Sequence, residues 1–250
     1  MPRLGDEETV DKLQALKVYT QYRDLISTAP LEIIYSGSAD LERVKQALAA
    51  AFATLPREEV RVISTAEPHV CRESVQYVED VLDVTQGKLG MGFSCGSDDM
   101  PALLMGNTLF GGSSNSKLFL NVREKLSLCY YASSLYHRQK GLITVSSGIE
   151  FQNYQRAYDE IMAQLEAVQK GELEDWELEG ARSILMGGHR ATLDDQGRLE
   201  EFWLGQTAAG LETDIPQLVD QIRGVTREQV AAAAQKLELD TIYFLKGKEG

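Results

Sequence analysis

Residues 110–119 read Phe-Gly-Gly-Ser-Ser-Asn-Ser-Lys-Leu-Phe, and residues 122–134 read Val-Arg-Glu-Lys-Leu-Ser-Leu-Cys-Tyr-Tyr-Ala-Ser-Ser. The glycine pair precedes a segment with helical spacing that presents Arg123, and a strand that opens with Tyr130 and Tyr131 follows. This order places a guanidinium and a phenol beside backbone that glycine leaves free to move. Such a combination suits the holding of an extended peptide.

Regular elements are expected on both sides of this stretch. The strand before it shows strict alternation, because Leu89, Met91 and Phe93 are separated by polar or small residues. The expected elements are a strand over 74–84, a strand over 88–95, a helix capped by Asp99 that ends at Phe110, a helix bearing Leu118, Phe119, Val122 and Leu126, and a hairpin of strands 129–137 and 142–149 joined at Lys140-Gly141.

The remainder of the chain is expected to be mostly helical. Expected are a helix capped by Asn153 with Tyr154, Tyr158, Ile161, Met162, Leu165 and Val168 on one face, helices over 175–190, 196–209 and 214–223, a helix after the capping box Thr226-x-x-Gln229, and a strand over 241–246. Hairpin strands interleaved with runs of helix predict an α+β fold, a mostly antiparallel sheet covered by helices.

The N-terminal part looks incomplete. It contains a probable helix over 9–27, a short strand over 31–36, and a helix after Asp40 that Pro56 stops. Two helices and one strand cannot build a sheet domain. We therefore expect 1–56 to be the trailing part of a domain that begins upstream, 57–73 to be a polar linker, and 74–250 to be a second, complete domain.

The central pattern resembles a known family. Gly-Gly, then Ser-x-Leu-Phe, then Arg-Glu-Lys, with a Tyr seven residues after the Arg, resembles the second half of the insulinase-like (pitrilysin-like) zinc metallopeptidases, which include the mitochondrial processing peptidase. The wording of 123–134 is most similar to the non-catalytic members of paired bacterial processing peptidases. The resemblance implies that an N-terminal half carries zinc on an H-x-x-E-H helix, while a related C-terminal half holds substrate with an Arg/Tyr pair.

This chain shows the second half of that division. Its histidines are His69, His137 and His189, and no two lie within five residues, so neither H-x-x-E-H nor H-E-x-x-H can be written. His189 with Asp194 and Asp195 lacks ligand spacing, and the preceding Gly187-Gly188 suggests a helix end, so a surface turn is favoured there. No cofactor is expected in the chain, and zinc is expected only upstream of it or in a partner chain.

The candidate substrate-binding residues carry open alternatives. The resemblance pairs Arg123 with Tyr130, but Tyr131 is the alternative phenol, because strand alternation sends the two tyrosines to opposite faces. The loop containing Gly111 and Gly112 could gate substrate, as a longer glycine-rich loop does in the processing peptidases. It could equally be a turn between two helices.

Charge restricts the partners. The chain has 25 Lys and Arg against 38 Asp and Glu, a net charge of −13, which argues against nucleic acid or anionic membrane and fits basic peptide segments better. Three widely spaced cysteines, no apolar signal segment and no membrane-spanning run favour a soluble cytoplasmic protein.

The function expected from these observations is the non-catalytic, substrate-holding or partner half of an insulinase-like peptidase. Its partners would be a peptide or protein substrate and an insulinase-like chain in a homodimer or heterodimer. Two alternatives stay open. The chain could be the excised C-terminal half of an active zinc endopeptidase whose metal site lies upstream, or a purely structural dimerisation subunit.

Overall fold

The computed structural model describes residues 5–61 and 71–248. The chain divides into two compact units, Met1–Thr65 and Ala66–Gly250, which are described separately. Within the described residues, no helix combines the length and apolar character needed to cross a membrane.

The first unit consists of short helices with little buried surface. Its helices are α1 (Glu7–Asp11), α2 (Ala15–Thr28) and α3 (Leu41–Phe52). The cap predicted at Asp40 is confirmed, since its carboxylate accepts a 2.9 Å hydrogen bond from the Arg43 N–H. The helix expected over 9–27 is interrupted at residues 12–14, and α3 has no buried residue.

The strand expected over 31–36 was wrong. These residues form no strand. A strand needs a hydrogen-bonding neighbour, and the described part of the first unit offers none. Instead, residues 57–61 bond to the end of α2, where Glu58 N–H donates to Ser27 O (2.9 Å) and Arg61 N–H to Thr28 O (2.7 Å). The rest of the expected linker, 62–70, lies outside the described residues.

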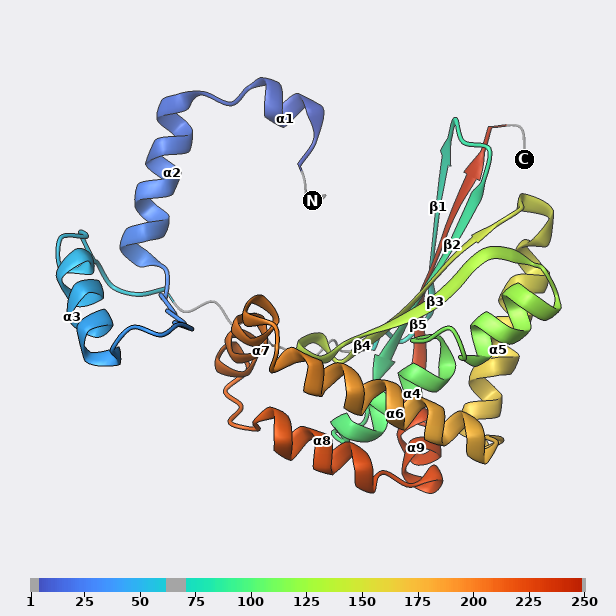
Figure 1. Cartoon of the computed structure of the whole chain (residues 1–250). Coiled ribbons are helices and arrows are strands. Elements are labelled where there is room, and N and C mark those ends of the chain that lie inside the picture. The colour runs from blue at the N-terminus through green and yellow to red at the C-terminus, as the bar shows by residue number, and fades with distance from the viewer. Residues whose placement is uncertain (1–4, 62–70, 249–250) are drawn as a thin grey trace. The chain divides into compact units, whose positions relative to one another are not determined.

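A five-stranded sheet is the centre of the second unit. In the order β1-β5-β2-β4-β3, only the β1–β5 pair is parallel, and the other three pairs are antiparallel (Figure 1). The α+β fold with a mostly antiparallel sheet is confirmed. The strands are β1 (Gln76–Leu82), β2 (Gly87–Cys95), β3 (Cys129–His137), β4 (Leu142–Ile149) and β5 (Leu237–Gly247).

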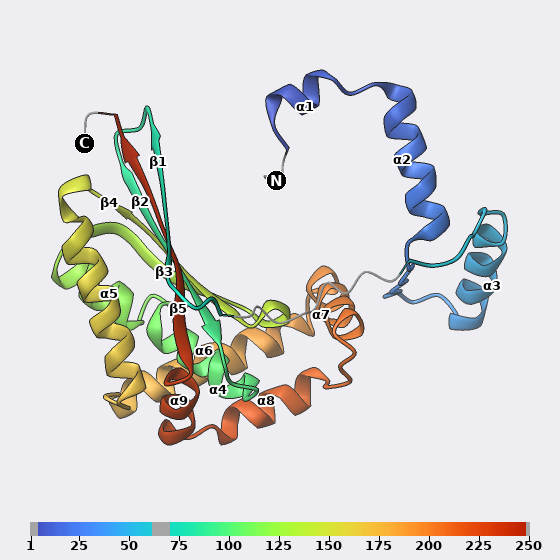
Figure 2. The ribbon, with the colours of Figure 1, turned by 180° about the vertical axis from the view of Figure 1, so that it is seen from behind.

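Helices gather on one face of this sheet, as Figures 1 and 2 show. They are α4 (Met100–Phe110), η1 (Leu118–Lys125), α5 (Tyr154–Gln169), α6 (Asp175–Thr192), α7 (Gln196–Ala208), α8 (Ile215–Gly224) and α9 (Arg227–Ala234). The predicted alternation in β2 is confirmed, because Leu89, Met91 and Phe93 are buried against these helices. Gly90 and Gly92, which alternate with them, belong to the opposite face, which we call the open face.

The helix expected to carry Arg123 is confirmed, and it is a π-helix. Three other local expectations need correction. The last strand begins at Leu237 rather than at 241. Asn153 occupies the N-cap position of α5, but its side chain makes no capping bond. Helix α6 continues through Gly187-Gly188, because neither glycine adopts a positive φ and the packing of α6 against α8 outweighs their low helix propensity.

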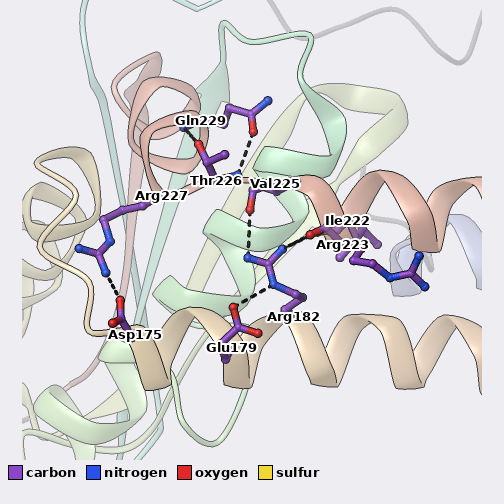
Figure 3. A network of polar contacts seen from close by, with 9 residues as sticks. All are labelled: Asp175, Glu179, Arg182, Ile222, Arg223, Val225, Thr226, Arg227 and Gln229. Carbon is purple, nitrogen blue, oxygen red and sulfur yellow. Dashed lines mark hydrogen bonds and ion pairs between the residues drawn. The ribbon is translucent and has the colours of Figure 1, made fainter.

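Polar contacts fasten the outer helices to one another, as Figure 3 shows. The Arg182 guanidinium on α6 donates to the carbonyls of Ile222 (2.8 Å), Arg223 (2.7 Å) and Val225 (3.0 Å) at the end of α8. The last carbonyls of a helix lack the usual partner one turn further on, and here, among the described residues, only the Val225 N–H reaches back, to Ile222 O (3.3 Å), so the arginine acts as a C-terminal cap. The predicted capping box of Thr226 and Gln229 then starts α9.

Candidate functional site

Arg123 is held in place by its own surroundings. It lies on η1, whose Leu118 and Val122 are buried in the core. Its Nε donates a 2.9 Å hydrogen bond to the carbonyl of Tyr130, and its Nη1 lies 2.8 Å from a carboxylate oxygen of Glu124. The guanidinium also stacks 4.7 Å from the ring centre of Phe119. Three contacts fix the cation, while 39% of its side chain stays exposed.

Tyr130 shares this surface with Arg123, and Tyr131 does not. A β-bulge in β3 lies between Cys129 and Tyr131, so Tyr130 has no partner residue on β4. Its side chain is largely exposed, at 64%. Tyr131 pairs with Gly148, and its hydroxyl lies 3.2 Å from Ser146 Oγ on the open face. The bulge gives the position opposite Gly148 to Tyr131 and leaves Tyr130 unpaired, and the Tyr130 carbonyl accepts the hydrogen bond from Arg123 Nε.

Two hollows meet at Tyr130. The first, of about 400 Å³, is lined by Arg123, Glu124, Ser127, Leu128, Cys129, Tyr130, Glu150 and Asn153. The second, of about 650 Å³, is lined by Thr85, Tyr130, Glu150, Phe151 and Gln152. Tyr130 and Glu150 border both hollows, and we call the two together the Arg123–Tyr130 trough.

Several lining residues were not predicted from the sequence. Ser127 adopts a left-handed backbone with φ of 49°, a strained conformation for a residue other than glycine. Glu150 and Asn153 follow β4 and lie more than twenty residues from Arg123 in the sequence. No spacing pattern connects them to it. Only the pairing of β3 with β4 brings them together.

Cys129 borders the trough but is unsuited to nucleophilic catalysis. Burial raises the pKa of its thiol to about 11, although the nearby Arg123 opposes the shift. The thiolate is the reactive form of cysteine, so at neutral pH this residue is almost entirely the unreactive thiol.

The two loop glycines serve close packing. A Cβ on Gly111 would lie 2.6 Å from the backbone nitrogen of Ser134 in β3, whose N–H donates to the Gly111 carbonyl (2.9 Å). A Cβ on Gly112 would lie 2.9 Å from the side-chain amide nitrogen of Asn107. This contact explains why glycine occurs here, and it agrees with the turn alternative.

A buried ion pair fixes the end of the same loop. Lys117 Nζ lies 3.1 and 3.3 Å from the two carboxylate oxygens of Glu177 on α6, and only 10% and 8% of the two side chains are exposed. Glu177 also accepts from the Glu174 N–H (2.8 Å) as part of a capping box. The turn that leads into the Arg123 helix is thereby anchored to α6.

Metal-binding geometry is absent from the described residues, where no group of three or more His, Cys, Asp or Glu side chains could hold one ion. His137 Nε2 lies 2.9 Å from Thr144 Oγ1. His189 lies within α6 rather than in the expected turn, and its burial, with a smaller contribution from Arg138, lowers the pKa of its imidazole. His69 lies outside the described residues.

Comparison with known proteins shows the family. The model described as "Peptidase M16 inactive domain" matches residues 12–185, so the chain belongs to the M16 peptidase family, as its inactive domain. It is 37% identical over 252 residues to the "Probable inactive metalloprotease YmfF" of Bacillus subtilis, covering 98% of this chain and 58% of that protein. The resemblance to the insulinase-like family, seen in 110–134, is confirmed.

Solved structures share the fold. A conserved protein from Enterococcus faecalis V583 matches with a TM-score of 0.86 and 26% identity, over 100% of this chain and 60% of that one. The peptidase M16 inactive domain from Pseudomonas fluorescens matches with a TM-score of 0.73 and 18% identity, over 97% and 60%. The chain thus spans about three fifths of the length of these relatives.

Proposed function

We propose that this chain is a non-catalytic peptide-holding half of an M16 protein and that an extended peptide lies in the Arg123–Tyr130 trough. The observation that carries the proposal is the convergence of Arg123 and Tyr130 on one open depression. The family match to an inactive domain supports the absence of catalysis in this half.

The trough offers the groups that a peptide backbone needs. Nε and Nη1 of Arg123 contact the Tyr130 carbonyl and the Glu124 carboxylate. Nη2 has no partner among the described residues, so its N–H groups can donate to a substrate carbonyl. The exposed Tyr130 side chain adds an apolar face and a hydroxyl. Because Arg123 is already positioned by Tyr130 and Phe119, little side-chain entropy is lost when a ligand binds.

The test is binding of an unstructured, fluorescently labelled peptide to the purified chain, followed by mass spectrometry of the recovered peptide. Arg123→Ala removes a charge-assisted donor and should weaken binding about 10- to 100-fold, corresponding to about 1.5–3 kcal/mol. Lys125→Ala, which removes an exposed cation from the same helix, is the matched control and should leave affinity unchanged.

Two results would count against the proposal. Equal affinity of the wild type and Arg123→Ala for the peptide would contradict peptide binding in the trough. A cleaved peptide would contradict the non-catalytic assignment. Dimerisation with an M16-like partner and a cytoplasmic location stay predictions.

A further inference from the structure

Strand β1 is exposed to solvent although it is rich in apolar residues. Six of its seven residues are exposed. The exposed apolar side chains lie on both faces, with Val78 and Leu82 on the open face beside Tyr243 and Gly247, and Tyr77 and Val81 on the other. Apolar residues on both faces are typical of strands that are covered on both sides, as in all-parallel sheets.

The outer edge of β1 also lacks a neighbouring strand among the described residues. In the sheet order β1 is terminal, with β5 as its one neighbour, so its outer backbone groups have no ladder partner within the described residues. Natural edge strands are usually protected by proline, charged side chains (lysine above all), a bulge or a covering segment. β1 contains neither proline nor lysine, its charged residues are Glu79 and Asp80, and its pairing with β5 runs without a register shift over seven residues.

The charge around this edge is negative. β1 itself carries Glu79 and Asp80 and no basic residue, and residues 72–88 carry Glu73, Glu79, Asp80 and Asp83 against Arg72 and Lys88. Lys246 lies 2.8 Å from Glu79 and satisfies that carboxylate. The Asp80 carboxylate accepts a 3.0 Å hydrogen bond from the neutral Tyr243 hydroxyl and forms no ion pair among the described residues. One carboxylate on the open face of the edge is therefore available to an incoming cation.

From this edge we infer a second binding surface, at which a basic, extended segment of another protein adds to the sheet as a strand beside β1. Backbone hydrogen bonds would supply affinity, and side chains facing Val78, Asp80 and Leu82 would supply specificity. A second copy of this chain fits less well, because it would bring the same carboxylates and a net charge of −13 to the edge.

The register defines the ligand. Val78, Asp80 and Leu82 lie on one face at alternate positions, so the incoming strand needs an apolar, a basic and an apolar side chain at its own alternate positions. The blocked peptide Thr-Val-Thr-Lys-Thr-Val-Thr has this pattern. It reads the same in both directions, so it matches whether the added strand is parallel or antiparallel to β1.

The test is amide hydrogen exchange of the full chain with and without this peptide, with affinity measured by titration. Added protection is expected at 76–82. Replacing the peptide lysine with glutamate should weaken binding about fivefold, since an attractive cross-strand pair becomes repulsive. N-methylation of alternate peptide amides should abolish binding, because the backbone bonds are lost.

Variants separate this surface from the trough. Asp80→Asn should reduce the preference for the lysine peptide over the glutamate peptide, whereas Asp194→Asn, an exposed charge on the α6–α7 turn, should not. Arg123→Ala should leave the peptide-induced protection at 76–82 intact. A result against peptide binding in the trough would therefore be distinguishable from a result against binding at β1. Protection confined to 129–137, or concentration-dependent protection of 76–82 without peptide, would overturn the inference, the latter in favour of self-association.

Discussion

The buried Lys117–Glu177 ion pair gives the sharpest stability prediction. Lys117→Met preserves side-chain volume but leaves the Glu177 carboxylate about 8% exposed with one remaining protein donor, the Glu174 N–H. Breaking a buried pair from one side costs about 3–5 kcal/mol. Because one donor remains and both side chains keep slight solvent contact, we expect about 3 kcal/mol of destabilisation.

The double variant tests the physical reason. Glu177→Gln keeps an oxygen for the capping box and should cost about 1.5 kcal/mol, while Lys117→Met with Glu177→Gln removes both charges and should cost only about 2 kcal/mol. The two changes would then couple by about 2.5 kcal/mol, within the range for residues in one network. Removing both charges is expected to cost less than leaving the Glu177 carboxylate buried without its cation.

Urea unfolding followed by tryptophan fluorescence and circular dichroism measures these values. Both tryptophans, Trp176 and Trp203, lie on helices of the second unit, so the fluorescence transition reports that unit. The midpoint should fall while the urea dependence of the unfolding free energy stays constant. Coupling below about 0.5 kcal/mol would refute the reasoning, because it would show that the two charges contribute independently.

Three further predictions use the same unfolding assay. Gly111→Ala places a methyl group against the Ser134 backbone and should lower the free energy of unfolding by about 1–3 kcal/mol. Gly188 lies in open space inside α6, so Gly188→Ala should stabilise the protein by up to about 1 kcal/mol through its higher helix propensity. Equal effects of the two variants would contradict the packing argument. Arg182→Ala should cost about 1.5–3 kcal/mol by uncapping α8, and Arg182→Lys should recover little, because one ammonium cannot reach three carbonyls. Burial holds the pKa of His189 in the folded chain below its unfolded value of about 6.5, so the unfolded chain binds more protons. The free energy of unfolding should therefore fall as pH drops below that value. The His189→Gln variant should lose less stability between neutral and mildly acidic pH, and an identical loss would contradict the burial of the imidazole.

Much of the second unit follows from local signals in the sequence. The alternation of Leu89, Met91 and Phe93 identified β2, and the capping residues Asp99 and Thr226 placed the starts of α4 and α9. Such signals work because they depend on neighbours a few residues away.

The errors arose where a distant partner decides the outcome. A strand over 31–36 needed a neighbour that the described part of its unit lacks. Gly187-Gly188 stayed helical because α6 packs against α8. The Lys117–Glu177 pair joins residues 60 positions apart, and no sequence pattern indicates it.

The candidate site divides in the same way. Arg123 and Tyr130 were identified through a family motif, and the structure brings both to one trough. The choice between Tyr130 and Tyr131 depended on a β-bulge, which inserts one unpaired residue and cannot be read from alternation. Glu150 and Asn153 joined the site only through strand pairing.

Photo-crosslinking at the trough tests the central claim most directly. With benzoylphenylalanine in place of Tyr130, irradiation in the presence of an unstructured peptide should yield a crosslinked, uncleaved peptide, and the yield should fall sharply when Arg123→Ala is added. The same side chain in place of Tyr131, on the open face, should crosslink far less. Equal crosslinking from both positions, or a yield that does not depend on Arg123, would contradict the account.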